Sequence, residues 1–279
     1  MTWQAVARKD FQDAIRSYWL IGLTAVFVLF VSLASGGLAY FTEDISASGV
    51  VGLLNGVLIT VFVPLLSLVV SFSALSVERE SGSLKLMLAL PHSRQDVVVG
   101  KFVGRSAAMA VAVVVGFVLP GIALAAFAEF QVGTYVGYVL WVVVLSTVFV
   151  AIGVGISANT TTQWRSIAVM LAFYLVFVIF WVMLQLVFGL VLLFLLSEWP
   201  EWMPYTVQEM ALGLRVVNPT GAFKILTSAF LEGQLLAPDA GQAQGVRDRS
   251  IQLWSLASLV AWTTIPLALG ILRFDDADL

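Results

Sequence analysis

The sequence predicts an all-α integral membrane protein with six transmembrane helices and both termini in the cytoplasm. Of its 279 residues, 60% are hydrophobic and 11% are charged, whereas a soluble domain is about 45–50% apolar and about 25% charged. Six apolar runs contain no Asp, Glu, Lys or Arg, and each reaches the length of about 20 residues that crosses a bilayer as a helix. These observations exclude a soluble globular enzyme, and runs of this length exclude an outer-membrane barrel.

The first segment, residues 1–17, is expected to be an amphipathic helix lying in the membrane interface. Apolar residues recur in it at helical spacing and polar residues fall largely on the other side, a pattern typical of interfacial helices. The alternative is a cytoplasmic extension of the first span. The apolar residues are Trp3, Val6, Ala7, Phe11, Ala14, Ile15 and Tyr18, and the polar ones are Gln4, Arg8, Gln12, Asp13 and Arg16.

The remainder, residues 18–279, is predicted to form one six-span domain. The first run is longer than the roughly 7–15 apolar residues of a signal peptide, so we expect it to be retained. A single central charge would cost about 2.5–3.5 kcal/mol on the insertion scale, so the absence of charge from all six runs is informative. The predicted spans are residues 18–41, 50–77, 106–128, 135–157, 167–197 and 251–272.

The distribution of Lys and Arg predicts the orientation. Basic residues precede the first span, follow the last and lie between spans two and three and spans four and five. The two short loops of the opposite side contain none. Since short cytoplasmic loops carry the excess of basic residues, this pattern places both termini in the cytoplasm, with residues 198–250 as a long external loop. Aromatic residues near its start and the apolar stripe of residues 222–231 predict short interfacial or partly re-entrant helices there.

The cytoplasmic loop of residues 78–105 contains an unusual short helix. A charged cluster ends span two, Gly82 allows a turn, and residues 83–90 are too apolar for water but too short to span a membrane. Pro91 ends this segment, and Ser93 with Asp96 has the spacing of a capping box for the next helix. The leucines of this helix pack either under the protein's own spans, as a plain connector, or in a groove of another protein.

The same loop carries a resemblance. The string Glu78-Arg79-Glu80-x-Gly82-x-Leu84, then Leu88-Ala89-Leu90-Pro91-His92-Ser93-Arg94 and Gly100-Lys101, resembles the signature of ABC-2-type transporter permeases. Within that family it is most similar to the NosY-like branch, which takes part in nitrous-oxide-reductase maturation. The layout of the whole chain resembles the family too, and Asn218-Pro219-Thr220 is similar to a feature near its last span.

The resemblance implies a permease subunit in the plasma membrane that is driven by a separate ABC ATPase. It implies that residues 78–105 dock in a cleft of that ATPase, that a second permease copy completes a homodimer, and that transport is export. The residues that would couple the two subunits are Glu78, Arg79, Glu80, Gly82, Leu84, Leu88, Pro91, Ser93, Arg94, Gly100 and Lys101.

Several classes of activity are disfavoured by what the sequence lacks. It has no Gly-rich phosphate-binding loop ending in Lys-Ser or Lys-Thr, so we expect no cofactor in this chain, with ATP and Mg on the partner, and no enzymatic activity. It has no Cys and one His, which offers no catalytic or metal site. The net charge of −3 does not favour nucleic acid, and the expected partners are the ATPase, the second copy and membrane lipid.

Two alternatives to a driven permease remain open. One is a membrane scaffold whose loop docks a partner without moving a substrate, and the other is an uncoupled channel, which the uncharged spans disfavour. The absence of charge in the spans favours an apolar or lipid-like cargo, or the release of a peptide or sulfur compound. The sequence does not identify the substrate.

Overall fold

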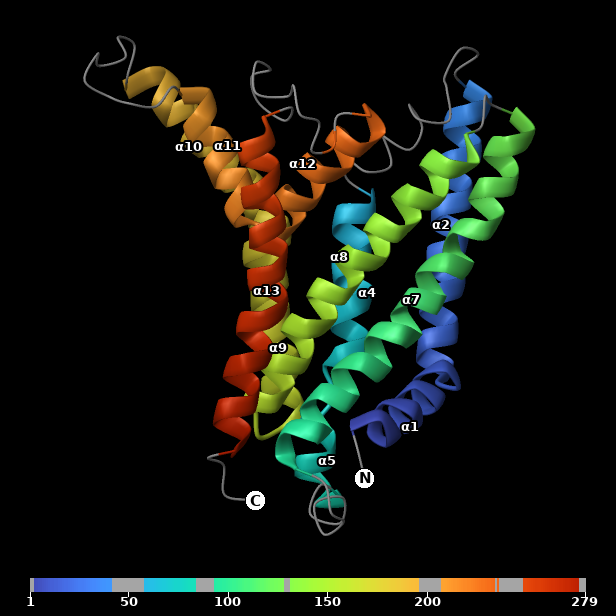
Figure 1. Cartoon of the computed structure of the whole chain (residues 1–279), viewed down its shortest axis with the longest axis vertical. Helices are drawn as coiled ribbons and strands as arrows, with labels where there is room; N and C mark the ends of the chain where they lie inside the picture. The colour runs from blue at the N-terminus through green and yellow to red at the C-terminus, as the bar shows by residue number, and fades with distance from the viewer. Residues whose placement is uncertain are drawn as a thin grey trace. The chain divides into compact units, whose positions relative to one another are not determined.

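The computed structural model describes residues 3–41, 58–83, 93–127, 131–195, 207–233, 235 and 248–275, and these residues form helices joined by short turns. The contacts divide the chain into two compact units. The first comprises residues 1–172 and 262–279, and the second comprises residues 173–261. Figure 1 labels the helices of both units, which are described separately below.

The first unit contains α1 (Trp3–Ile15), α2 (Tyr18–Phe41), α4 (Leu58–Ser71), α5 (Ser76–Glu80), α7 (Arg94–Phe127) and α8 (Val132–Asn159). It also contains most of α9 (Gln163–Tyr174) and the second half of α13 (Arg249–Asp275). The long helix α7 packs against α1, α2 and α8, and α4 packs against α8. Helix α1 crosses the foot of α2 and α7 (Figure 1), and it bends away from the first 16 residues of α2 by 63°.

The core of the first unit lies along α8, which buries residues along most of its length. The N-terminal half of α8 packs around Phe117 of α7. The rings of Phe27, Tyr135 and Tyr138 meet the ring of Phe117 edge to face, with centroids 5.9, 6.1 and 6.0 Å away. Such edge-to-face pairs stabilise packing beyond the area they bury. The Tyr135 hydroxyl also donates a hydrogen bond to the Phe117 carbonyl at 2.7 Å, which satisfies the polar end of this side chain.

The second unit contains the π-helix η1 (Leu175–Phe180), α10 (Trp181–Leu195), α11 (Val207–Val217) and α12 (Pro219–Leu231), with the first half of α13. Helices α11 and α12 form a tight corner at Asn218. The Asn218 side chain accepts hydrogen bonds from the backbone N–H groups of Thr220 and Gly221, and Pro219 occupies the first turn. Asn at the cap and Pro directly after it are the residues that best start a helix.

The helices of the described residues can be compared with the spans expected from the sequence. Helix α2 covers the same residues as the expected first span, 18–41. Five helical stretches are long and apolar enough to cross a membrane in the part of the chain that the structure describes, and α1 with α2 makes a sixth, bent stretch. The five stretches are Leu58–Glu80, Arg94–Ala126, Val132–Asn159, Gln163–Val191 and Arg249–Phe274. The all-helical membrane fold predicted from the sequence is therefore confirmed.

Candidate functional site

The candidate site is formed by the two flanks of residues 84–92. These nine residues lie outside the described part of the chain, and so do three of the residues singled out by sequence, Leu84, Leu88 and Pro91. The other eight are placed. Glu78, Arg79, Glu80 and Gly82 belong to α5 and the turn after it, and Ser93, Arg94, Gly100 and Lys101 belong to the start of α7.

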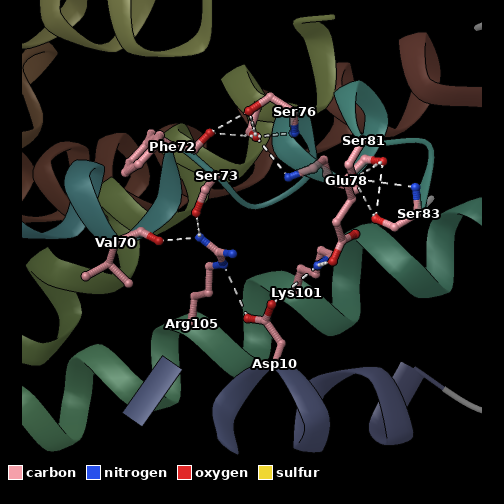
Figure 2. Close-up of polar contacts among 12 residues, drawn as sticks. Asp10, Val70, Phe72, Ser73, Ser76, Glu78, Ser81, Ser83, Lys101 and Arg105 are labelled. Atoms are coloured by element: carbon pink, nitrogen blue, oxygen red, sulfur yellow. Dashed lines mark hydrogen bonds and ion pairs between the residues drawn. The ribbon is translucent and has the colours of Figure 1, made fainter. Parts of the chain in front are cut away.

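Four charged side chains connect α1, α5 and α7 at this end of the first unit (Figure 2). The Lys101 ammonium lies 2.7 Å from Glu78 Oε1 and 3.4 Å from Asp10 Oδ1. Asp10 Oδ2 lies 3.3 Å from Nε of Arg105. Asp10 and Lys101 are both buried. We call these four residues the charged quartet; its two carboxylates balance its two cations, which is what makes burial of the group tolerable.

Arg105 extends the quartet to the end of α4. Its guanidinium donates to the Val70 carbonyl, and its Nη1 lies 3.3 Å from the Ser73 hydroxyl (Figure 2). The Val70 carbonyl belongs to the last turn of α4, where backbone acceptors have no partner within the helix. Arg105 therefore satisfies a helix end and pairs with Asp10 on α1 at the same time.

Gly100 has a packing role that its place in the family signature does not reveal. A Cβ at Gly100 would lie 2.6 Å from Val6 Cβ and 2.8 Å from the Trp3 carbonyl oxygen. One turn later, a Cβ at Gly104 would lie 2.6 Å from the Ala7 carbonyl oxygen. Two glycines four residues apart let helix backbones approach closely. This close contact brings Asp10 within reach of Lys101 and Arg105.

The start of α7 is fixed by the capping box that the sequence predicts. The Asp96 backbone N–H donates to Ser93 Oγ at 3.0 Å, and the Ser93 backbone N–H donates to Asp96 Oδ2 at 3.3 Å. On the other flank, Gly82 has a φ of +74°, a left-handed conformation that glycine adopts without steric cost. Both ends of residues 84–92 are thus held by specific local structure.

Two arginines of the signature converge on the end of α13. The Arg94 Nη1 donates to the Phe274 carbonyl at 2.6 Å. The guanidinium carbons of Arg79 and Arg94 lie 5.5 and 5.8 Å from the centre of the Phe274 ring, within the range of cation–π attraction. Phe274 is 1% exposed. The C-terminal end of the last helix is therefore part of this site.

Helix α5 is also attached to the end of α8 and the start of α9. Arg79 Nη1 donates to the Thr160 carbonyl at 3.2 Å, and the Gln163 backbone N–H donates to Glu80 Oε2 at 2.9 Å. Between α4 and α5, where the helix is interrupted, Ser157 Oγ accepts hydrogen bonds from the backbone N–H groups of Leu75 and Ser76, both at 3.0 Å. A side chain of α8 thereby pairs these two N–H groups, as buried backbone groups require.

Sequence reasoning missed four residues of this site. Asp10 and Arg105 complete the charged quartet, Phe274 receives the two arginines, and Ser157 closes the helix break. Only Asp10 had a signal: it lies on the buried face of α1 with Val6 and Ala7, and a carboxylate on such a face needs a cation. The partners of the others lie far away in the sequence.

The site can transmit movement between helices. Within the described residues, no group of three or more His, Asp or Glu side chains could hold a metal ion. The arrangement offers paired charges and capped helix ends that connect five helices to the flanks of one loop. Displacement of that loop would act on α5 and α7 together, and through them on α1, α8 and α13.

Comparison with known sequences gives two results. The sequence model described as "ABC-2 family transporter protein" matches residues 4–279. Two curated proteins, both named "Probable ABC transporter permease protein NosY", are similar over nearly their whole length. The one from Stutzerimonas stutzeri is 30% identical over 95% of each chain, and the one from Pseudomonas aeruginosa is 26% identical over 96% of each chain.

Proposed function

Since the chain belongs to the ABC-2 family of transporter proteins, we propose that it exports a substrate through a pathway driven by a separate ATPase subunit. The family makes the chain a multi-pass permease subunit of an ABC transporter in the plasma membrane. The proposal adds the direction of transport, the docking of the ATPase on residues 78–105, and a homodimer in which two permease copies meet two ATPases. ATP and Mg would be bound by the partner, and both termini would lie in the cytoplasm.

The charged quartet is the observation that carries the proposal. Lys101 and Glu78 join the two flanks of residues 84–92 at 2.7 Å. Because this ion pair joins α5 to α7, a push on residues 84–92 would reach both helices together. Asp10 and Arg105 pass the same displacement to α1 and to the end of α4.

In the proposed mechanism, closure of the ATPase pair on ATP pushes residues 83–90. The charged quartet and the Phe274 contacts transfer this push to the spans, which rock as rigid bodies and open an alternate face. Glu78, Arg79, Glu80, Gly82, Leu84, Leu88, Pro91, Ser93, Arg94, Gly100 and Lys101 act in coupling. Leu84 and Leu88 would fill an apolar groove of the ATPase, in the helix-in-groove mode.

The test is ATP hydrolysis in proteoliposomes that contain this chain and the ATPase encoded beside it. Leu84→Asp/Leu88→Asp should abolish the permease-dependent part of the hydrolysis and the recovery of the ATPase in a pull-down, because charges cannot enter an apolar groove without a large cost. Leu84→Met/Leu88→Met is the matched control, since it alters the same positions but keeps them apolar, and it should retain both.

Two outcomes would contradict the proposal. Wild-type recovery of the ATPase by the Asp variant would remove the docking role of this segment. Stable association with equal hydrolysis in the presence and absence of the permease would indicate a scaffold that holds a partner without driving transport.

A further inference from the structure

A cationic cavity of about 230 Å³ lies within the second unit, between the η1–α10 segment and the α11–α12 corner. None of its lining residues belongs to the charged quartet or to the Phe274 contacts. Its polar lining residues come from three helices: Trp181 and Gln185 from α10, Arg215 from α11, and Thr220, Lys224 and Ser228 from α12. Among the described residues that line it, none carries a carboxylate.

Within the described residues, the two cations of this cavity have no carboxylate partner. No ion pair joins Arg215 or Lys224 to a described carboxylate. Arg215 is exposed and Lys224 is partly buried, and burial with the neighbouring charge of Arg215 lowers the pKa of Lys224 below its ordinary value. Two like charges at one cavity disfavour each other, and a bound anion would relieve this repulsion.

Two further side chains of the lining can donate to a ligand. The Gln185 amide and the Ser228 hydroxyl belong to the lining together with the two cations, and each carries a donor. The Thr220 hydroxyl is already occupied, because it donates to Asn218 Oδ1 at 2.6 Å, and the indole Nε1 of Trp181 is shielded from solvent. The set therefore suits a ligand with several acceptor atoms and a negative charge.

Hydrogen bonds of Asn218 and a close backbone approach at Gly221 fix the walls of the cavity. The Asn218 side chain caps α12 and donates through Nδ2 to the Phe177 carbonyl of η1 at 2.6 Å, which attaches the corner to the π-helix. At the corner itself, a Cβ on Gly221 would clash with the Arg215 carbonyl oxygen, so only glycine permits this approach. These contacts position the donors before any ligand arrives.

We propose that this cavity binds an oxyanion, either the phosphate group of an anionic phospholipid or a soluble anion of sulfate or phosphate size. The Arg215 guanidinium and the Lys224 ammonium would neutralise its charge, and the Ser228 hydroxyl would donate to one of its oxygens. This inference does not depend on the proposed coupling to an ATPase, and its test measures binding alone.

The experiment uses the full chain purified in a maltoside detergent without phosphate. One arm measures the binding of radiolabelled sulfate and of radiolabelled inorganic phosphate by scintillation proximity. The other arm titrates phosphatidylglycerol and counts bound lipids by native mass spectrometry. Binding in the first arm identifies a soluble anion, and binding only in the second identifies a lipid headgroup.

Three variants make the result specific. Arg215→Gln/Lys224→Gln should weaken binding about tenfold or more for each charge removed, because charge-assisted hydrogen bonds are the strong ones. Ser228→Ala keeps both cations but removes the hydroxyl donor, and it should weaken binding about threefold to tenfold. Arg249→Gln is the matched control, because Arg249 lies in the same unit, is exposed and does not line the cavity.

The proposal is overturned if the wild type binds sulfate, phosphate and phosphatidylglycerol no better than Arg215→Gln/Lys224→Gln does, or if Arg249→Gln weakens binding as much. If the doubly substituted chain is not monodisperse, Ser228→Ala decides the question, since unchanged binding by that variant also overturns the proposal. Failure of the ATPase experiment would leave this result unaffected.

Discussion

The ammonium of Lys101 lies 2.7 Å from Glu78 Oε1, and this ion pair joins the helix that precedes residues 84–92 to the helix that follows them. Lys101 is 3% exposed, so the pair has little competition from water. The pair is strengthened by Asp10, which approaches the same ammonium from α1. The arrangement gives a prediction about the stability of the chain.

Lys101→Met should lower the free energy of unfolding by about 3 kcal/mol, because it leaves Glu78 without a cation and Asp10 with Arg105 alone. Adding Glu78→Gln should restore part of this loss, with an interaction energy of about 1–3 kcal/mol between the two positions. Unfolding in mixed micelles of a mild detergent and dodecyl sulfate measures all three variants. Strictly additive effects would show that the two side chains do not interact.

Gly100→Val should detach α1 from α7, because even a Cβ at this position would meet Val6 at 2.6 Å. The chain has no cysteine, so a single Val6→Cys reports the change by its reaction with a maleimide. Val6 is 7% exposed, and the thiol should react slowly in the parent chain and at least about tenfold faster with Gly100→Val, because reactivity follows exposure. Arg8→Cys, on the exposed side of α1, is the control and should react at one rate in both backgrounds.

Phe274→Leu should destabilise the chain by about 0.5–2 kcal/mol, because leucine fills much of the space but has no ring for the guanidinium groups of Arg79 and Arg94. Phe274→Ala should cost more, about 3–5 kcal/mol, since it also leaves a cavity. Thermal unfolding of the two variants side by side separates the contributions. A loss in Phe274→Ala with none in Phe274→Leu would mean that packing alone holds this contact, with no part played by the arginines.

Asn218→Ser should cost about 1–2 kcal/mol, because serine keeps the cap of α12 but loses the donor to the Phe177 carbonyl. Asn218→Ala should cost more, since it removes the cap as well. Hydrogen exchange of the α12 amides measures the difference between the variants. Exchange of Thr220 and Gly221 at the parent rate in Asn218→Ala would show that the cap is not needed.

The sequence predicted the features that depend on neighbours along the chain. The first span, the Ser93–Asp96 capping box and the turn at Gly82 all follow from local residue preferences, and each has its counterpart in the structure. The contact of Arg94 with Phe274 joins residues 180 positions apart, and no periodicity specifies it. The π-helix of residues 175–180 was likewise not predicted, because its composition is that of any apolar span.

The proposed oxyanion cavity also depends on residues that are distant in the sequence, so the sequence did not predict it. The sequence shows spans without charge, which favours an apolar cargo, and it assigns Arg215 and Lys224 to the long loop. The fold brings both cations beside Trp181 and Gln185 of α10. Loop residues can therefore supply charge to the surroundings of a span that has none of its own, and hydropathy along the chain does not reveal it.

The π-helix has a consequence that concerns chain length. A π-turn closes hydrogen bonds over one more residue than an α-turn, and each residue of an α-helix rotates its face by about 100°. Deleting one residue from η1 would therefore restore a plain α-helix and leave Trp181 and Gln185 facing much as before, because the wider turn absorbs the extra residue. Deleting Met183 or Leu184 from the regular helix α10 would instead turn Gln185 away from Trp181 by about that angle, with every side chain of the cavity still present in the sequence. The cavity depends on how many residues separate its lining residues as much as on which residues line it.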